Sequence, residues 1–145
     1  MRTYKIIRII LSFTVLVFPS LAFGVDLPRD TYEQSAFDSG CDKNQMNMNI
    51  CSYYDFKVLD TKLNEVYRTQ IERLKGTPHE KRLIHAQRAW LNYVEADCLY
   101  QNGPREESGS IWSLEQNTCK SAHFNARIKL LESFLECTSN GCPGV

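Results

Sequence analysis

The sequence predicts a small all-α domain in which three antiparallel helices, a helical hairpin followed by a third helix, are stapled by disulfides. Apolar residues recur every three or four positions over three long stretches, which is the period of an amphipathic helix. Beyond residue 24 there is no run of alternating β-branched residues that would indicate a strand. The 145 residues make one ordinary domain, and all six cysteines lie beyond residue 40.

Residues 1–24 have the pattern of a secretory signal peptide. Three basic residues precede a nearly unbroken apolar run at 9–18, and small residues follow at 20–24. A membrane anchor is the alternative, but the run is about 10 residues long and a spanning helix needs about 20. Cleavage after Ala22 or Gly24 leaves no cysteine near the junction for a lipid. We therefore expect a soluble periplasmic or secreted protein with no stable membrane anchor.

The charge balance argues against a nucleic-acid partner. The whole chain has 17 basic and 17 acidic residues. Loss of residues 1–24 removes three basic residues and leaves a net charge of −3. A surface that follows phosphates needs the opposite bias, whereas a cationic partner is weakly favoured.

The first helices follow an irregular start. Residues 25–40 have no clear period and predict a flexible N-terminal arm. A helical pattern then extends over 43–75 and is stopped by Gly76-Thr77-Pro78. Thr77 is expected to cap a second helix over 78–99, with Glu80 completing a capping box. A turn this short makes the two helices antiparallel neighbours.

The rest of the domain is a polar loop and a third helix. Residues 101–110 combine Asn-Gly-Pro with a fully polar stretch and predict a loop. A third helix is expected over 111–137, with a break near Asn117 as one possibility. The helical domain therefore covers 41–137, and 138–145 form a C-terminal turn tied by a disulfide.

An even number of cysteines in a small exported chain indicates up to three disulfides. Asn140-Gly141 forms a turn that can bring Cys137 and Cys142 together. Cys98 and Cys119 bracket the polar loop and are the next pair that we favour.

Cys41 and Cys51 remain as the third pair by elimination. Reduced structural thiols or a zinc site are the alternative. The chain contains no CxxC, and its histidines show no ligand spacing with the cysteines, so we expect no metal and no cofactor.

The sequence contains no convergent catalytic set, so we expect no enzyme activity. His79, His85 and His123 fit no zinc or nucleophile motif. Glu106 and Glu107 lie in the predicted loop, whereas acid–base pairs normally lie on rigid elements.

Polar residues interrupt the predicted helix faces beside Trp90. Asp60 and Asn64 lie one helical turn apart on the first helix. Counting residues outward from the connection near residue 77 places them at about the same level as Gln87 and Arg88 on the second helix. We expect a structural network between the two helices. A ligand pocket around Arg88 is the functional alternative.

With these residues placed, the chain resembles the LprI-like family of exported bacterial proteins, named after a lysozyme-inhibitor lipoprotein. The matching pieces span about residues 41–131 and are Met48-Asn49-Ile50-Cys51, Asp60-Thr61-Lys62-Leu63-Asn64-Glu65-Val66-Tyr67, Leu83, Ala86-Gln87-Arg88-Ala89-Trp90, Tyr93, Cys98, Gly109-Ser110-Ile111, Cys119 and Arg127. The resemblance implies a disulfide-linked helical domain outside the cytoplasm, and inhibition of lysozyme is attributed to the founding member of the family. Val94-Glu95 replaces the usual Arg-Asp, so a charge pair expected there is absent. The lipid-anchor cysteine of the founding protein is also missing.

We weigh two kinds of binding protein, of which the first follows from this resemblance and from the placement of the loop. The first is an inhibitor that binds a muramidase through the polar loop, with Arg105, Ser108, Gly109 and Ser110 as the candidate contacts. The second is an envelope interaction or immunity-type module that uses a helix face to bind another protein or a peptidoglycan fragment. A hydrolase ranks last.

Overall fold

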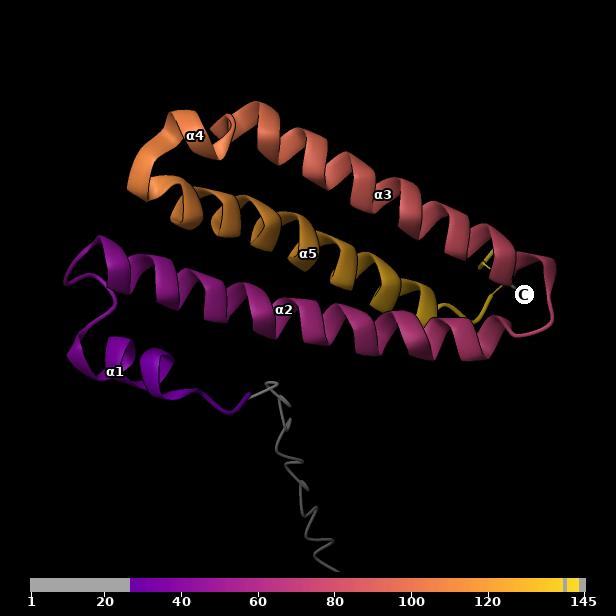
Figure 1. The fold of residues 1–145 in the computed structure, drawn as a ribbon. Coiled ribbons are helices and arrows are strands. Elements are labelled where there is room, and N and C mark those ends of the chain that lie inside the picture. The colour runs from indigo at the N-terminus through magenta and orange to yellow at the C-terminus, as the bar shows by residue number, and fades with distance from the viewer. Residues whose placement is uncertain (1–26, 140, 144–145) are drawn as a thin grey trace, which may run out of the picture.

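Three long helices form the body of the protein, as the computed structural model shows (Figure 1). They are α2 (Gln45–Leu74), α3 (Pro78–Asn102) and α5 (Trp112–Glu136). A short helix, α1 (Thr31–Ser39), precedes them, and α4 (Arg105–Ser108) and the 3-10 turn η1 (Gly109–Ile111) join α3 to α5. The structure describes residues 27–139 and 141–143, and the predicted signal peptide lies outside them. The all-α prediction is confirmed.

Helix α5 lies between α2 and α3, which converge only near their connecting turn (Figure 1). The two helices of the predicted hairpin are antiparallel as expected, but over most of their length each faces α5 rather than the other. The buried core accordingly takes residues from all three helices: Leu63, Val66, Val94, Cys98, Phe124, Ile128 and Leu131.

The predicted pairing of all six cysteines is confirmed. Bonds join Cys41 to Cys51, Cys98 to Cys119, and Cys137 to Cys142. No cysteine is free, so reduced thiols are excluded as the state of this structure. The first bond ties the loop after α1 to α2, the second ties α3 to α5, and the third closes the C-terminal turn.

The prediction of an irregular arm over 25–40 is wrong for 31–39, which form α1. Asp30 and Glu33 make a reciprocal capping box: the Asp30 side chain accepts from the backbone N–H of Glu33, and the Glu33 side chain accepts from that of Asp30. Ala36 is buried against the body of the domain. The Asp-x-x-Glu spacing was a usable signal, but nine residues are too few to show a clear helical period.

The capping box predicted for α3 is also wrong. Thr77 is the N-cap residue, but its hydroxyl donates to the carbonyl of Leu74 at 2.6 Å and makes no capping bond. The carboxylate of Glu80 accepts from the backbone N–H of Gly76 at 2.8 Å. The carbonyl of Leu74, at the end of α2, accepts from both the backbone N–H and the hydroxyl of Thr77, so this hydroxyl bonds back to α2 instead of capping α3.

The predicted loop over 101–110 is largely helical. Helix α3 continues to Asn102, and α4 and η1 follow directly after Gly103 and Pro104. The indole N–H of Trp112 donates to the carbonyl of Gly103 at 3.1 Å and fixes this connection. Helix α5 runs through Asn117 without the break that was considered there. No helix in the described part of the chain is both long and apolar enough to cross a membrane.

Candidate functional site

The α4–η1 segment, residues 105–111, projects at the end of the bundle where α2 begins (Figure 1). Arg105, Gly109 and Ser110 are exposed. Ser108 differs from them, since its half-buried hydroxyl donates to the carbonyl of Asn102 at 2.6 Å and of Pro104 at 3.1 Å. Of the four loop residues singled out from the sequence, three therefore face solvent and Ser108 holds the turn.

Contacts from three helices hold this segment in place. The Cys98–Cys119 disulfide joins α3 and α5 with a Cα–Cα distance of 5.8 Å, and its cysteines lie four residues before the end of α3 and seven residues after the start of α5. From α2, the side chain of Asn49 donates to the carbonyl of Ser110 at 2.9 Å. The guanidinium of Arg105 lies 5.8 Å from the centre of the Trp112 ring. The segment is thus a braced surface feature.

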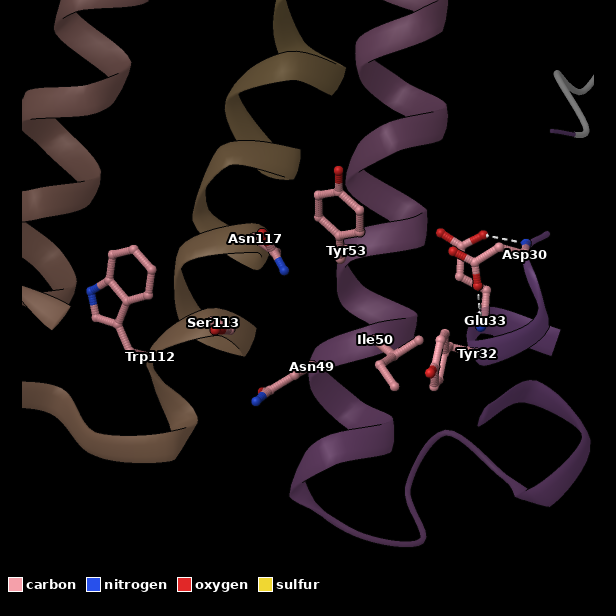
Figure 2. Close-up of a pocket in the computed structure, with 9 residues that line it drawn as sticks. All are labelled: Asp30, Tyr32, Glu33, Asn49, Ile50, Tyr53, Trp112, Ser113 and Asn117. Carbon is pink, nitrogen blue, oxygen red and sulfur yellow. Dashed lines mark hydrogen bonds between the residues drawn. The ribbon is translucent and has the colours of Figure 1, made fainter. Parts of the chain in front are cut away.

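A groove lies beside this segment, between α1, α2 and the start of α5 (Figure 2). Its volume is about 350 Å³. Tyr32 and Tyr53 line it with 80% and 53% of their surface exposed, and Trp112 also borders it. Asn49 and Asn117 supply amides. Sequence reasoning missed this groove because one wall of it is α1, which was not predicted.

A lysine from α2 pairs with Glu33, one of the two acidic residues that line the groove. Glu33 is 4% exposed, and its carboxylate accepts from the Lys57 ammonium at 2.6 Å. This hydrogen bond raises the pKa of Lys57 above 10.5, although partial desolvation acts in the opposite direction. The ion pair fixes α1 on α2 and so fixes the groove.

The polar network predicted between the first two helices does not form. Asn64 donates to the carbonyl of Asp60 within its own helix, and Arg88 is exposed. Gln87 is buried and accepts from the Nε–H of Arg127, on α5, at 3.0 Å. The reason is the position of α5, which separates these parts of α2 and α3. Arg88 lines none of the five best-defined cavities on the described residues.

Arg127 is a half-buried cation held by an amide and an aromatic ring. Its guanidinium lies 5.6 Å from the centre of the Trp90 ring. Burial lowers the pKa of Arg127, and the nearby Tyr67 hydroxyl raises it to a smaller extent. Gln87, Trp90 and Arg127 all belong to the motifs quoted for the family resemblance. The structure thus assigns these motif residues to the junction of α3 and α5.

The replacement of Arg-Asp by Val94-Glu95 has a clear structural result. Val94 is 1% exposed and belongs to the core. Glu95 accepts from the ammonium of Lys120 at 2.7 Å, so a charge pair between α3 and α5 does exist at this position.

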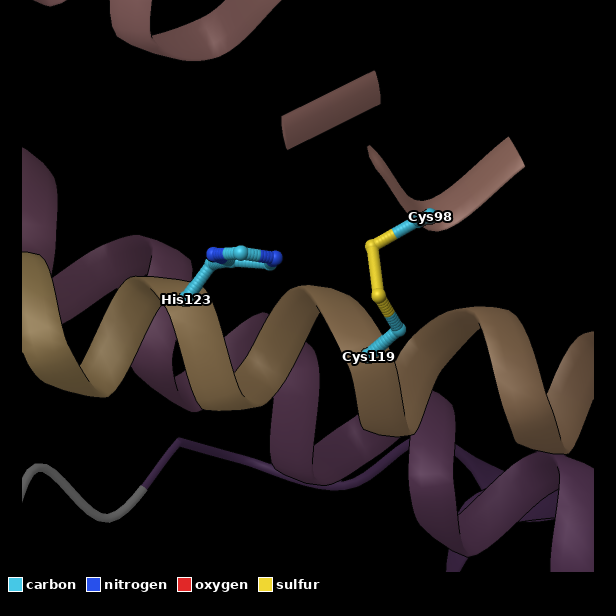
Figure 3. Close-up of side chains that lie close together, drawn as sticks. All are labelled: Cys98, Cys119 and His123. Atoms are coloured by element: carbon cyan, nitrogen blue, oxygen red, sulfur yellow. A yellow bond between two sulfur atoms is a disulfide. The ribbon is translucent and has the colours of Figure 1, made fainter. Parts of the chain in front are cut away.

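The cysteine and histidine group on α3 and α5 does not make a zinc site in this oxidised form. Cys98, Cys119 and His123 place their potential ligand atoms within 4.8 Å of one another (Figure 3). The two sulfurs, however, are bonded to each other in the disulfide, so neither is available as the thiolate that binds a metal ion. A ring nitrogen of His123 lies 2.8 Å from a carboxylate oxygen of Asp97, which accounts for its orientation.

Comparison with known proteins gives the chain a family. The family model for the lysozyme inhibitor LprI matches residues 38–131, which is most of the helical body. An uncharacterized protein of Rhizobium meliloti (strain 1021) is 27% identical over 109 residues, covering 67% of this chain and 78% of the relative. No solved structure matches the chain. On the extent of the family match, the chain belongs to the lysozyme inhibitor LprI family.

Proposed function

We propose that this protein binds a muramidase and blocks it with the α4–η1 segment. The observation that carries the proposal is the braced projection of Arg105, Gly109 and Ser110 from a chain of the lysozyme inhibitor family. A projection that is ordered before binding loses little conformational entropy when it enters a cleft.

The chemistry of the segment suits a muramidase cleft. Such a cleft carries catalytic carboxylates between sugar-binding subsites. The Arg105 guanidinium can pair with a carboxylate, and the exposed backbone at Gly109 and Ser110 can approach closely because Gly109 has no side chain. The tyrosine-lined groove next to the segment extends the surface available to the partner. Without residues 1–24 the chain has a net charge of −3, which favours encounter with a basic lysozyme.

The same proposal includes export. We infer that residues 1–24 direct secretion and are removed, which places the domain in the periplasm or outside the cell. The oxidised state of all six cysteines supports an oxidising compartment.

A second candidate function, binding of another envelope protein through a helix face, is favoured by the outer side of α3. Two tyrosines seven residues apart lie on one side of this helix with much of their surface accessible, Tyr93 at 55% and Tyr100 at 87%. Aromatic residues on an exposed helix are common anchors of protein interfaces.

A lysis assay separates these functions. The oxidised protein should slow the clearing of a cell-wall suspension by lysozyme. The double variant Arg105→Ala, Ser110→Ala should lose at least tenfold in potency, because it removes an exposed cation and a hydroxyl without touching the Ser108 turn. Arg88→Ala, which removes an exposed arginine on α3, is the matched control and should keep full potency.

The same assay can reject the proposal. Unchanged lysis at micromolar protein would rule out lysozyme as the target. Inhibition that survives the double variant but is lost in Tyr93→Ser, Tyr100→Ser would move the binding surface to α3.

A further inference from the structure

A small cavity lies at the other end of the bundle, where α2 ends, α3 begins and the C-terminal turn returns. Its volume is about 180 Å³. Leu74, Leu83 and Phe134 give it apolar walls, one from each long helix. Pro143, just after the Cys137–Cys142 disulfide, contributes a further wall. Phe134 and Pro143 lie beyond the residues that the family model matches, so part of this cavity is built outside the family's common domain.

An unpaired buried amide lines this cavity. Gln70 is 1% exposed, and its side-chain oxygen has no hydrogen-bond partner. It is the sole buried side-chain oxygen or nitrogen in the described part of the chain that is left without one. An unpaired polar group of this kind is costly, so its position beside a cavity points to a hydrogen-bond donor that the bare chain does not supply.

The cavity also has a cationic side. Arg82 and His79, from the first turns of α3, line it, and their side chains make no hydrogen bond or ion pair in the described part of the chain. The start of a 25-residue helix adds positive potential there. None of the described residues that line the cavity is an aspartate or glutamate. Arg73, which is close in sequence, is already committed to carbonyls at the end of α5.

We propose that this cavity binds the C-terminal residue of a peptide, with the free carboxylate at Arg82 and His79 and the residue's backbone N–H donating to Gln70. The apolar walls would receive a small side chain such as a methyl group. A free ammonium is disfavoured as the donor because the cavity already carries a guanidinium and no carboxylate to balance a second positive charge. The volume suits one small residue rather than a long segment.

An NMR titration of the oxidised protein, recovered from the periplasm of an expression host, tests this site. The probe is N-acetylalanine, which carries a carboxylate, an N–H and a methyl group, and both enantiomers are used. Binding of either enantiomer should shift the Gln70 side-chain amide signals saturably. N-acetylalanine methyl ester lacks the carboxylate and propionate lacks the N–H, and each should bind at least tenfold more weakly.

Two variants and a control complete the test. Arg82→Gln should weaken the probe at least tenfold without changing the melting temperature, while Arg88→Gln, on the same helix but away from the cavity, should bind like the wild type. Gln70→Met should raise the melting temperature, because it removes a buried unpaired amide, and should still lose the probe.

The proposal is overturned if neither enantiomer gives saturable shifts, since water alone would then satisfy Gln70. It is also overturned if the ester binds as well as the acid, or if Arg82→Gln keeps the affinity. Should Gln70→Met fail to fold, the Arg82→Gln and Arg88→Gln pair decides the outcome. This site lies at the opposite end of the bundle from the α4–η1 segment (Figure 1), so the lysis assay and this titration succeed or fail independently.

Discussion

The Nε–H of Arg127 on α5 donates to the side-chain oxygen of Gln87 on α3 at 3.0 Å. Trp90 lies against the same guanidinium, with its ring centre 5.6 Å away. In the described part of the chain, no carboxylate makes an ion pair with Arg127. An amide and an aromatic ring therefore hold a half-buried cation at the junction of two helices.

The substitution Gln87→Leu should lower the free energy of unfolding by about 1–3 kcal/mol, because it leaves the Arg127 Nε–H buried without an acceptor. The double variant Gln87→Leu, Arg127→Met should be less destabilised than the sum of the two single variants. Urea unfolding of the four proteins measures the coupling, which we expect to exceed about 0.5 kcal/mol. Additive effects would show that the two side chains do not support each other.

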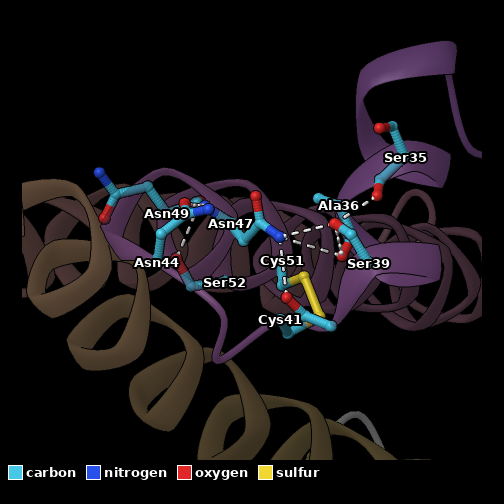
Figure 4. Close-up of a disulfide and its surroundings, with 10 residues drawn as sticks. Ser35, Ala36, Ser39, Cys41, Asn44, Asn47, Asn49, Cys51 and Ser52 are labelled. Atoms are coloured by element: carbon cyan, nitrogen blue, oxygen red, sulfur yellow. Dashed lines mark hydrogen bonds between the residues drawn. A yellow bond between two sulfur atoms is a disulfide. The ribbon is translucent and has the colours of Figure 1, made fainter.

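The first disulfide should control the order of α1. Figure 4 shows Cys41–Cys51 next to Asn47, whose side chain donates to the hydroxyl of Ser39 at 2.9 Å and to the carbonyl of Gly40 at 2.8 Å. The double variant Cys41→Ser, Cys51→Ser should have a free energy of unfolding about 2–4 kcal/mol lower than that of the wild type. Amide exchange should speed up mainly in α1.

The matched control for this variant removes the last disulfide instead. Cys137→Ser, Cys142→Ser should speed exchange around the C-terminal turn and leave α1 protected. Equal acceleration of α1 in both variants would contradict a local role for Cys41–Cys51.

The capping box of α1 should be measurable on its own. Asp30→Ala removes the acceptor for the Glu33 backbone N–H and should cost about 0.5–2 kcal/mol. Asp38→Ala, at an exposed position in the last turn of α1, is the comparison. Chemical denaturation of both variants measures the two losses of stability. Equal losses would show that the capping box contributes no more to stability than an exposed aspartate does.

The ion pair between α1 and α2 should weaken in alkali. The pKa of Lys57 is raised above 10.5 by its hydrogen bond to Glu33, so folding favours the charged ammonium. The stability that it contributes is fully present below the unfolded-state pKa and is lost as the pH rises through the folded-state value. We expect the melting temperature to fall above pH 10.5 more steeply for the wild type than for Lys57→Met.

Titration of tyrosines is common to both proteins, so the difference between the two curves isolates Lys57. If the melting temperatures of the two proteins fall equally steeply in alkali, the ion pair contributes nothing to stability. Replacement by arginine, which stays protonated in this range, should move the loss to higher pH.

Local patterns in the sequence were sufficient for the long helices and for one disulfide. The period of apolar residues predicts α2, α3 and α5 to within a few residues, because helix formation depends on neighbours three and four positions apart. The pairing of Cys137 with Cys142 follows from a short turn. The same patterns missed α1, whose nine residues rely on a capping box, a disulfide and burial of Ala36 against the body of the domain.

The partners of the polar residues required the tertiary structure. Counting from the turn places Gln87 level with Asn64, and a simple hairpin would have joined them. Helix α5 packs between the two helices and brings Arg127 to Gln87 instead. The same packing brings Gln70, Arg82 and Pro143 to one cavity. Periodicity tells which face of a helix is buried, but it does not tell which helix buries it, since that choice depends on contacts between residues far apart in the chain.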